Sequence, residues 1–338
     1  MVQYRLAQPE DEEALLDLWV AANPGTTREA WRRDYHRVPA LRERVHVAIA
    51  PGGSLLAAAA FWPREVRDAR GAALKVGDLS HVATRPEARR QGHARRLVEL
   101  TIEAMREEGC VWSSLTTSEE ARTLYEALGW RAFPRPVREG IASAQAGSSG
   151  AFSVSRYEPA SEPEGWDALA RVYDAFNAAR PLTVARDAAY WRDFFVPHLT
   201  AWLSGHAPVI LVARRAGQAD VRGYAIVYYS DEEPARAFGL DRLFTVSELG
   251  IFPGDEEAVS ALLAAALSES GGRLLGGRVY APREPEIDAA IEQLFGQSAR
   301  QDQDSEPMAR VIAPDFEQSD LDALFAAPGA MAWPLDDV

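Results

Sequence analysis

The chain has 338 residues, of which 47% are hydrophobic and 25% are charged, and its formal net charge is -14. This length suits two domains of ordinary size, each able to bury a core of its own. The negative charge argues against a nucleic-acid-binding protein, because such proteins usually present a basic face. Cys110 is the only cysteine, which excludes an intrachain disulfide and a cysteine-based metal site.

Signals for metals and for targeting are equally sparse. The six histidines show no H-E-x-x-H or comparable spacing, so we expect no metal. The N-terminus has no apolar run of signal length, and no stretch approaches the length of a membrane span. We therefore expect a cytoplasmic protein that binds no membrane.

The first part of the chain alternates between strand and helix patterns. We expect a strand at residues 2–6, a helix at 11–19 and a hairpin over 45–63. Residues 75–84 form the next strand, which ends at Arg85-Pro86 because the residue before a proline is pushed towards extended geometry. Apolar residues then recur at i, i+3 and i+4 up to Gly109, which predicts an amphipathic helix.

A basic loop joins this strand to this helix. It reads Arg89-Arg90-Gln91-Gly92-His93-Ala94. Its glycine lets the backbone approach a ligand closely, and the first free N–H groups of the following helix point outward to meet an anion. The arrangement predicts a site for a diphosphate.

A second strand and helix follow at residues 111–117 and 118–128. Ser118 is a suitable N-cap, Gly129 ends the helix, and Tyr125 lies on its apolar face. Taken by itself, Tyr125 is a core residue whose hydroxyl finds a local partner, as most helical tyrosines are.

Together these segments resemble the signatures of the GNAT acyltransferase superfamily. Arg89, Gly92 and Ala94 match its acetyl-CoA motif, Q/R-x-x-G-x-G/A. Residues 118–130 match its segment N-x-x-A-x-x-x-Y-x-x-x-G-F/W/Y, with serine in place of asparagine. The resemblance implies that acetyl-CoA is the co-substrate and that Tyr125 protonates the departing CoA thiolate. The cofactor-binding residues that it implies are Val82, Ala83, Thr84, Arg89, Arg90, Gln91, Gly92, His93, Ala94, Arg95 and Ser118.

Two candidates for the proton acceptor lie just before this cofactor segment. Strand alternation predicts one face with Asp78, Ser80 and Val82 and the opposite face with Leu79, His81 and Ala83. Only one of Asp78 and His81 should therefore face the acceptor, and a base with a pKa near the working pH favours His81 or a desolvated Asp78. Alternatively, Asp78 bonds backbone at a strand end and His81 is a core histidine.

The second half repeats the order of elements after a small, polar stretch at residues 144–150, which looks like a linker. We expect an N-terminal domain at 1–143 and a C-terminal domain at 151–338, with its last strand at 308–312. Where the first half has the basic loop, the second has Gly254-Asp255-Glu256-Glu257, whose carboxylates would repel a pyrophosphate. The C-terminal domain is thus expected to be degenerate and to shape the acceptor site or contact a second subunit.

The whole chain is expected to be a mixed-sheet α/β protein with tandem GNAT folds. It resembles the Eis-like branch, which acetylates amines, but has no room after Ile312 for the third domain of that branch. The function implied is N-acetyl transfer from acetyl-CoA to the primary amine of a small molecule by direct attack. The alternatives are a non-catalytic acetyl-CoA-binding regulatory protein and an acetyltransferase that acts on proteins or peptides. Exposed aromatic residues such as Trp202 and Tyr228 would support a homo-oligomer.

Overall fold

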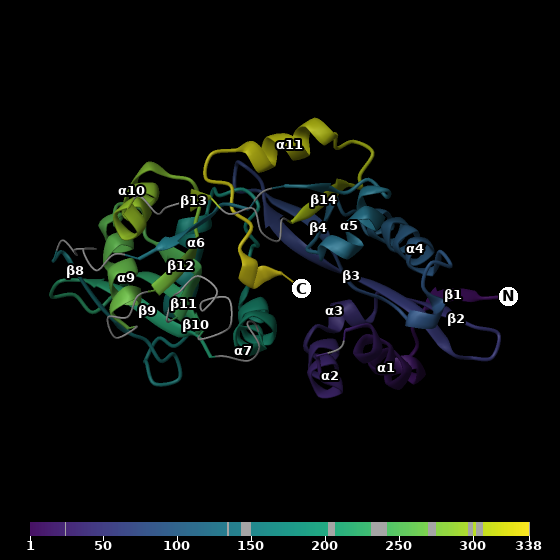
Figure 1. Ribbon diagram of the computed structural model, residues 1–338. Coiled ribbons are helices and arrows are strands. Elements are labelled where there is room, and N and C mark those ends of the chain that lie inside the picture. Colours follow the sequence, from purple (N-terminus) through teal and green to yellow (C-terminus); the bar gives the residue numbers. More distant parts are fainter. Residues whose placement is uncertain are drawn as a thin grey trace.

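Two mixed β-sheets carry the fold. The computed structural model describes residues 1–23, 25–133, 135–142, 150–201, 207–230, 242–269, 275–296, 300–301 and 307–337. Each sheet has seven strands, and helices pack against them (Figure 1). This arrangement confirms the mixed α/β fold predicted from the sequence.

The first sheet contains the strands that hold the predicted site. β4 and β5 run parallel, whereas the other neighbours in this sheet are antiparallel. The order is β1 (Gln3–Leu6), β2 (Val45–Ile49), β3 (Leu55–Arg67), β4 (Ala73–Thr84), β5 (Trp112–Leu115), β14 (Met308–Val311) and β6 (Arg131–Ala132).

Helices cover both faces of this sheet. Side chains alternate along β3, so that Ala60 and Trp62 pack in one core and Phe61 packs in another. The first core includes α1 (Glu12–Ala22), with α2 (Arg28–Arg37) and α3 (Pro39–Arg42) beside it. The second includes α4 (His93–Glu107) and α5 (Glu119–Glu126). The predicted cofactor loop and Tyr125 thus lie on the α4 side.

The second sheet repeats the strand order of the first. Its order is β13 (Arg300–Gln301), β7 (Val137–Ile141), β12 (Leu275–Tyr280), β11 (Arg242–Ile251), β10 (Val221–Ser230), β9 (Val209–Arg215) and β8 (Phe152–Arg156). β11 and β12 are parallel and are joined through α9 (Glu257–Ser268), as β4 and β5 are joined through α4. The remaining helices are α6 (Asp167–Asn177), the π-helical η3 (Tyr190–Phe195), α7 (Val196–Ala201), α10 (Pro285–Phe295), α11 (Gln318–Ala326) and the short 3-10 turns η1 (Pro9–Asp11), η2 (Pro86–Ala88) and η6 (Pro334–Asp336).

Two strands cross between the halves. β14 pairs with β5 and β6 of the first sheet, so the prediction that it completes the second half is wrong. β7, which precedes the predicted linker, pairs with β12 and β13 of the second sheet. A short strand pattern does not specify its partner, because strand preference depends on the neighbouring strands. Apart from Gly150, the linker lies outside the described residues, and the domain limits stay a prediction.

The halves are also joined along the far end of β3. There β3 extends beyond β2, and residues 182–185 pair with it instead: Leu182 N donates to Arg67 O (2.9 Å) and Ala185 N donates to Glu65 O (2.8 Å). The C-terminal segment attaches next to this contact, since Met331 N donates to Pro181 O (2.9 Å). Residues 331–337 are therefore held between the two sheets.

The prediction that Tyr228 is an exposed aromatic residue is wrong. Its side chain lies on the inner strand β10, is only 2% exposed and donates from its hydroxyl to Leu199 O (2.6 Å). Trp202 lies outside the described residues. Tyr228 therefore offers no surface for self-association.

Candidate active site

The predicted cofactor loop lies at the mouth of a cavity of about 520 Å³. Gly92 is the N-cap of α4 and has a φ of 82°, a left-handed conformation that favours glycine. A Cβ added there would meet no atom within 4 Å, so the space in front of the helix is open. Arg89, Arg90 and Arg95 are exposed around it. These features fit the binding of a diphosphate at the first amides of α4.

The same cavity brings together most of the predicted residues. It is lined by the end of β4, the loop, the start of α4 and α5, and the predicted residues among its lining are Val82, Ala83, Thr84, Arg89, Arg90, Gly92, His93, Ala94, Arg95, Ser118 and Tyr125. Gln91 is not among them, because its side-chain amide turns back to donate to Glu87 O (3.1 Å). Ser118 is the N-cap of α5, but its side chain makes no cap hydrogen bond.

Tyr125 reaches this cavity from α5. The side chain is 7% exposed, and its ring meets that of Trp130 edge-on with the centroids 6.0 Å apart. Burial raises the pKa of the Tyr125 hydroxyl to about 12, so the group keeps its proton at neutral pH. Within the described part of the chain, no hydrogen bond occupies this hydroxyl. It is thus available to donate to a group in the cavity.

β4 and β5 diverge part-way along β4. The two strands pair only from Val76 to Asp78 of β4, opposite Trp112 to Ser114 of β5, and beyond Asp78 the strands separate. Asp78 and Ser114 therefore mark the fork of the sheet.

A β-bulge in β4 overturns the predicted alternation of side chains. Ala58 pairs with Ala83 and Ala60 with Ser80, so β4 carries one more residue than β3 in this stretch. His81, within the bulge, has a φ of 54°. As a result Leu79 packs in the core with α4, whereas Ala83 packs in the core with α1, although a regular strand would put both on one face.

The structure places His81 among aromatic rings. Its ring meets Trp19 and Trp31 edge-on, with centroids 5.0 and 5.4 Å away. Its Nδ1 lies 3.0 Å from Ser80 Oγ, and its Nε2 is buried without a hydrogen-bond partner. Burial lowers the pKa of His81 to about 4, so the imidazole is neutral at pH 7.

Asp78 lies at the fork and forms a buried ion pair with Arg64 of β3. Ser114 Oγ donates to Asp78 Oδ1 (2.8 Å). Burial raises the pKa of Asp78 to about 6, although the Arg64 charge and the Ser114 hydroxyl both oppose the shift. The carboxylate lines a separate cavity of about 40 Å³, which has room for one or two waters. Neither Asp78 nor His81 lines the cofactor cavity.

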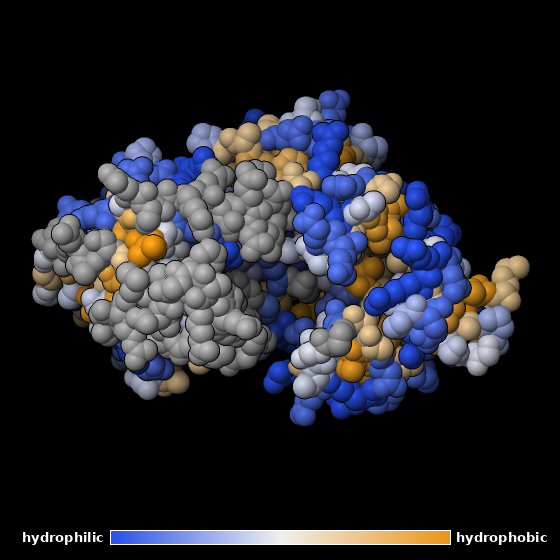
Figure 2. Space-filling model, viewed as in Figure 1, coloured by the Kyte–Doolittle hydropathy of each residue, from blue (hydrophilic) through white to orange (hydrophobic). Residues whose placement is uncertain are grey.

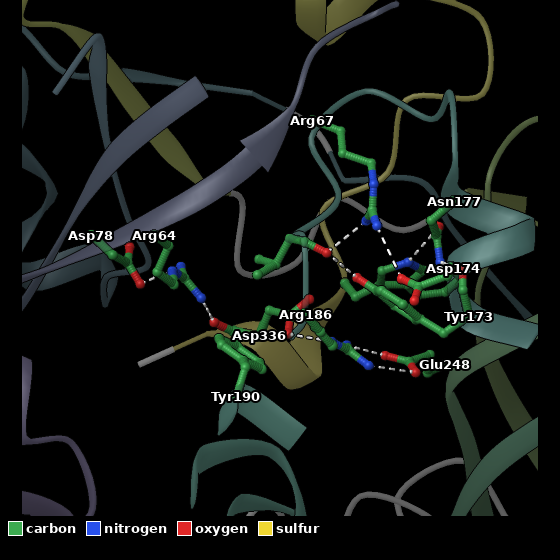
Figure 3. Close-up of polar contacts among 12 residues, drawn as sticks. Arg64, Arg67, Asp78, Tyr173, Asp174, Asn177, Arg186, Tyr190, Glu248 and Asp336 are labelled. Atoms are coloured by element: carbon green, nitrogen blue, oxygen red, sulfur yellow. Dashed lines mark hydrogen bonds and ion pairs between the residues drawn. The ribbon is translucent and has the colours of Figure 1, made fainter. Parts of the chain in front are cut away.

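A buried polar network that the sequence reading missed surrounds this fork (Figure 3). Arg64 links Asp78 to the main-chain carbonyl of Asp336, and Arg186 links Asp336 to Glu248 of β11. The only sequence signal is at Arg64, an arginine on the same face of β3 as the apolar Trp62 and Val66. In space-filling view the surface is hollowed between the halves, with hydrophilic side chains visible inside (Figure 2).

With this geometry established, the chain can be compared with known proteins. Residues 3–133 match the acetyltransferase (GNAT) domain family. The matched segment, which is less than half of the chain, contains the loop, the fork and Tyr125. No curated protein matches the chain by sequence.

Solved structures extend the likeness beyond the GNAT domain to nearly the whole chain. The GCN5-related N-acetyltransferase from Anabaena variabilis is 15% identical with a TM-score of 0.71, and the match covers 92% of this chain and 73% of that one. Eis1 from Mycobacterium abscessus is 20% identical with a TM-score of 0.64, covering 92% and 74%. A tandem GNAT protein from the clavulanic acid biosynthesis pathway is 13% identical with a TM-score of 0.53, covering 93% and 100%. At these identities the likeness shows the fold.

The second half differs from the GNAT domain at the position of the loop. Gly254 N donates to Glu256 Oε1 (2.9 Å), so a carboxylate occupies an amide at the start of this helix. Asp255 is 0% exposed and is paired with Arg215 and Arg222. Asp255, Glu256 and Glu257 line a cavity of about 460 Å³ together with Arg215. That the second half binds no pyrophosphate stays a prediction.

Other sites are not found in the described part of the chain. No three His, Cys, Asp or Glu side chains there come together as a metal site. No described helix is long and apolar enough to cross a membrane. Cys110 is buried, and burial raises the pKa of its thiol to about 11, which leaves it unreactive.

Proposed function

We propose that the chain transfers the acetyl group of acetyl-CoA to a primary amine by direct attack. The observation that carries this proposal is the cavity of about 520 Å³, in which the end of β4, the open amides of α4 and the Tyr125 side chain face one space. Acetyl-CoA is long, negatively charged at its pyrophosphate and reactive at its thioester. The cavity has the arginines of the loop for the pyrophosphate and the Tyr125 hydroxyl as a proton donor.

The residues of the loop supply binding. The first amides of α4 and the surrounding arginines hold the pyrophosphate, and the exposed backbone of Val82, Ala83 and Thr84 holds the pantetheine arm. The bulge at His81 interrupts the pairing of β4 with β3 just before Val82 and Ala83, which line the cavity, and in this proposal their backbone N–H groups polarise the thioester carbonyl.

The scheme includes a proton donor for the sulfur and a proton acceptor for the amine. The amine nitrogen bonds to the carbonyl carbon, and the C–S bond breaks as Tyr125 donates its proton to sulfur. The proton lost by the amine passes to Asp78 at the fork through a water in the cavity of about 40 Å³ that Asp78 lines. Asp78 is favoured over His81 for this role, because the His81 ring is enclosed by Trp19 and Trp31 and its low pKa makes it a weak base. No covalent intermediate is needed.

Replacing Gly92 by glutamate should weaken acetyl-CoA binding at least about tenfold, because a side chain strains the left-handed conformation and its carboxylate repels the pyrophosphate. Gly53→Glu is the matched control. Gly53 has a φ of 85° and equally open surroundings, but it lies in the hairpin turn away from the cavity. Titration calorimetry with acetyl-CoA measures the difference, and equal affinities of the two variants would remove the loop from the binding site.

The pH dependence of kcat/KM should report Asp78. Because its pKa is raised to about 6 and the ionised form accepts the proton, kcat/KM should fall about tenfold per pH unit below pH 6 and level off above it. In Asp78→Asn this break should vanish and the plateau should be lower. A break at pH 6 that persists in the variant would assign it to another group.

The function itself is tested by CoA release from acetyl-CoA in the presence of polyamines, aminoglycosides, amino acids and peptides. Turnover with one of these amines supports transfer and names the acceptor class. Binding of acetyl-CoA without any turnover would replace the proposal with a regulatory binding role. Turnover with peptides alone would point to a protein acceptor.

A further inference from the structure

Asp336 is held in a fixed position at the fork by residues of both halves (Figure 3). Its Oδ1 accepts from Arg186 Nε (2.9 Å) and from the Tyr190 hydroxyl (2.9 Å). Its main-chain carbonyl accepts from Arg64, which also binds Asp78. Two hydrogen bonds therefore hold the side chain at Oδ1, and a third holds the main chain.

The second carboxylate oxygen of Asp336, Oδ2, takes no part in these contacts. Asp336 is 4% exposed, and among the residues that the structure describes its buried Oδ2 has no hydrogen-bond partner. Leaving a buried carboxylate oxygen unpaired is unfavourable, so such an oxygen in a native site calls for an occupant. Asp336 lines the cavity of about 40 Å³ that Asp78 also lines.

The charges around this cavity favour a cation. Arg64 and Arg186 are shared among the carboxylates of Asp78, Glu248 and Asp336, so negative charge is in excess in this network. Asp337 adds none, because both of its oxygens accept from Arg135 Nη2 (2.8 Å each). The excess charge and the unpaired oxygen coincide at Asp336.

We infer that Oδ2 of Asp336 binds the ammonium group of the acceptor, which makes a cationic alkylamine the substrate class. The inference rests on the proposed acetyl transfer and adds the group that selects the acceptor. A cavity of this size admits an ammonium head but no bulkier group, and an ammonium carries three donors for the oxygens around it. Asp78, which is paired with the same Arg64, takes one proton from the ammonium and releases it to solvent. The neutral nitrogen then attacks the thioester carbon, and the ionised Asp78 takes the second proton that this nitrogen loses.

The test uses n-butylamine as the probe and 1-butanol as its uncharged match, both titrated into the CoA-saturated protein. Binding is followed by NMR at the indole N–H of Trp112, which lines the cavity and has no hydrogen-bond partner. We expect butylamine to bind and butanol not to bind. Asp336→Asn preserves the shape and the Oδ1 contacts but places an NH₂ group at Oδ2, and should weaken butylamine binding about 10- to 100-fold.

Asp174→Asn is the control, since Asp174 pairs with Arg67 at the surface and does not line the cavity, and it should bind butylamine as the wild type does. Equal binding by Asp336→Asn and the wild type, or wild-type binding that does not distinguish butylamine from butanol, would overturn the inference. The comparison of butylamine with butanol uses the wild-type protein, so it does not depend on whether a variant folds. Turnover of the same amine with acetyl-CoA is a separate readout: binding at Asp336 without acetylation would remove the transferase proposal and leave the ammonium site.

Discussion

Replacing Tyr125 by phenylalanine should lower kcat about 100- to 1000-fold while leaving the affinity for acetyl-CoA nearly unchanged. The expected size is that of a lost general acid. The hydroxyl faces the cofactor cavity, and its raised pKa of about 12 keeps it protonated across the assay range. The ring itself packs against Trp130 and remains in phenylalanine, so the fold should be preserved. Steady-state kinetics with a saturating amine measures the loss.

Tyr157→Phe is the matched control for this variant. The Tyr157 hydroxyl donates to Gly165 O (2.7 Å) in the second half, away from the cofactor cavity. Its loss should reduce stability by about 1 kcal/mol and leave kcat unchanged. If Tyr125→Phe retained the wild-type kcat, water or another donor would protonate the thiolate, and Tyr125 would be a packing residue.

Replacing Arg186 by methionine should lower the free energy of unfolding by about 3–5 kcal/mol. The Arg186 side chain is fully buried, with Nη1 and Nη2 at 3.0 and 2.5 Å from the Glu248 carboxylate and Nε on Asp336. The rings of Tyr173 and Phe195 lie on its guanidinium, each 3.9 Å from Cζ. Methionine keeps the volume but leaves two buried carboxylates without their cation. Urea denaturation at pH 7 measures the change.

The effect should shrink at lower pH, because burial raises the pKa of Glu248 and a proton can then replace the lost charge. Arg171→Met is the control, since its pair with Glu164 is half exposed and should contribute less than about 1 kcal/mol. A loss of similar size in both variants would show that the Arg186 network is not what joins the C-terminal segment to the second half.

The strand, loop and helix around Gly92 were predictable because their signals are local in sequence. A strand, a glycine that becomes an N-cap and an amphipathic helix follow one another directly, and Tyr125 comes one strand and one turn later. The GNAT signatures consist of just these neighbouring positions. The repeated strand order of the second half was likewise visible in the hydrophobic pattern.

The acceptor side of the site was not predictable from such patterns. Arg64 and Asp336 are 272 positions apart, and strand periodicity gives the face of a residue without naming its partner. The bulge at His81 adds one residue to β4 without a sequence mark, and it reverses the faces expected for the residues that follow. The sequence did not show that β14 pairs with β5 in the first sheet, because a strand of four residues does not specify its partner strand.

The most direct test of the account is a single-turnover reaction of acetyl-CoA with an amine acceptor, analysed by mass spectrometry of the small molecules and of the protein. Direct transfer predicts that acetylated amine and free CoA appear together, with no acetyl group on the protein at any time. An acetylated protein that then passes its acetyl group to the amine would contradict direct attack at the fork. Intact acetyl-CoA that stays bound in the presence of every amine would contradict catalysis altogether.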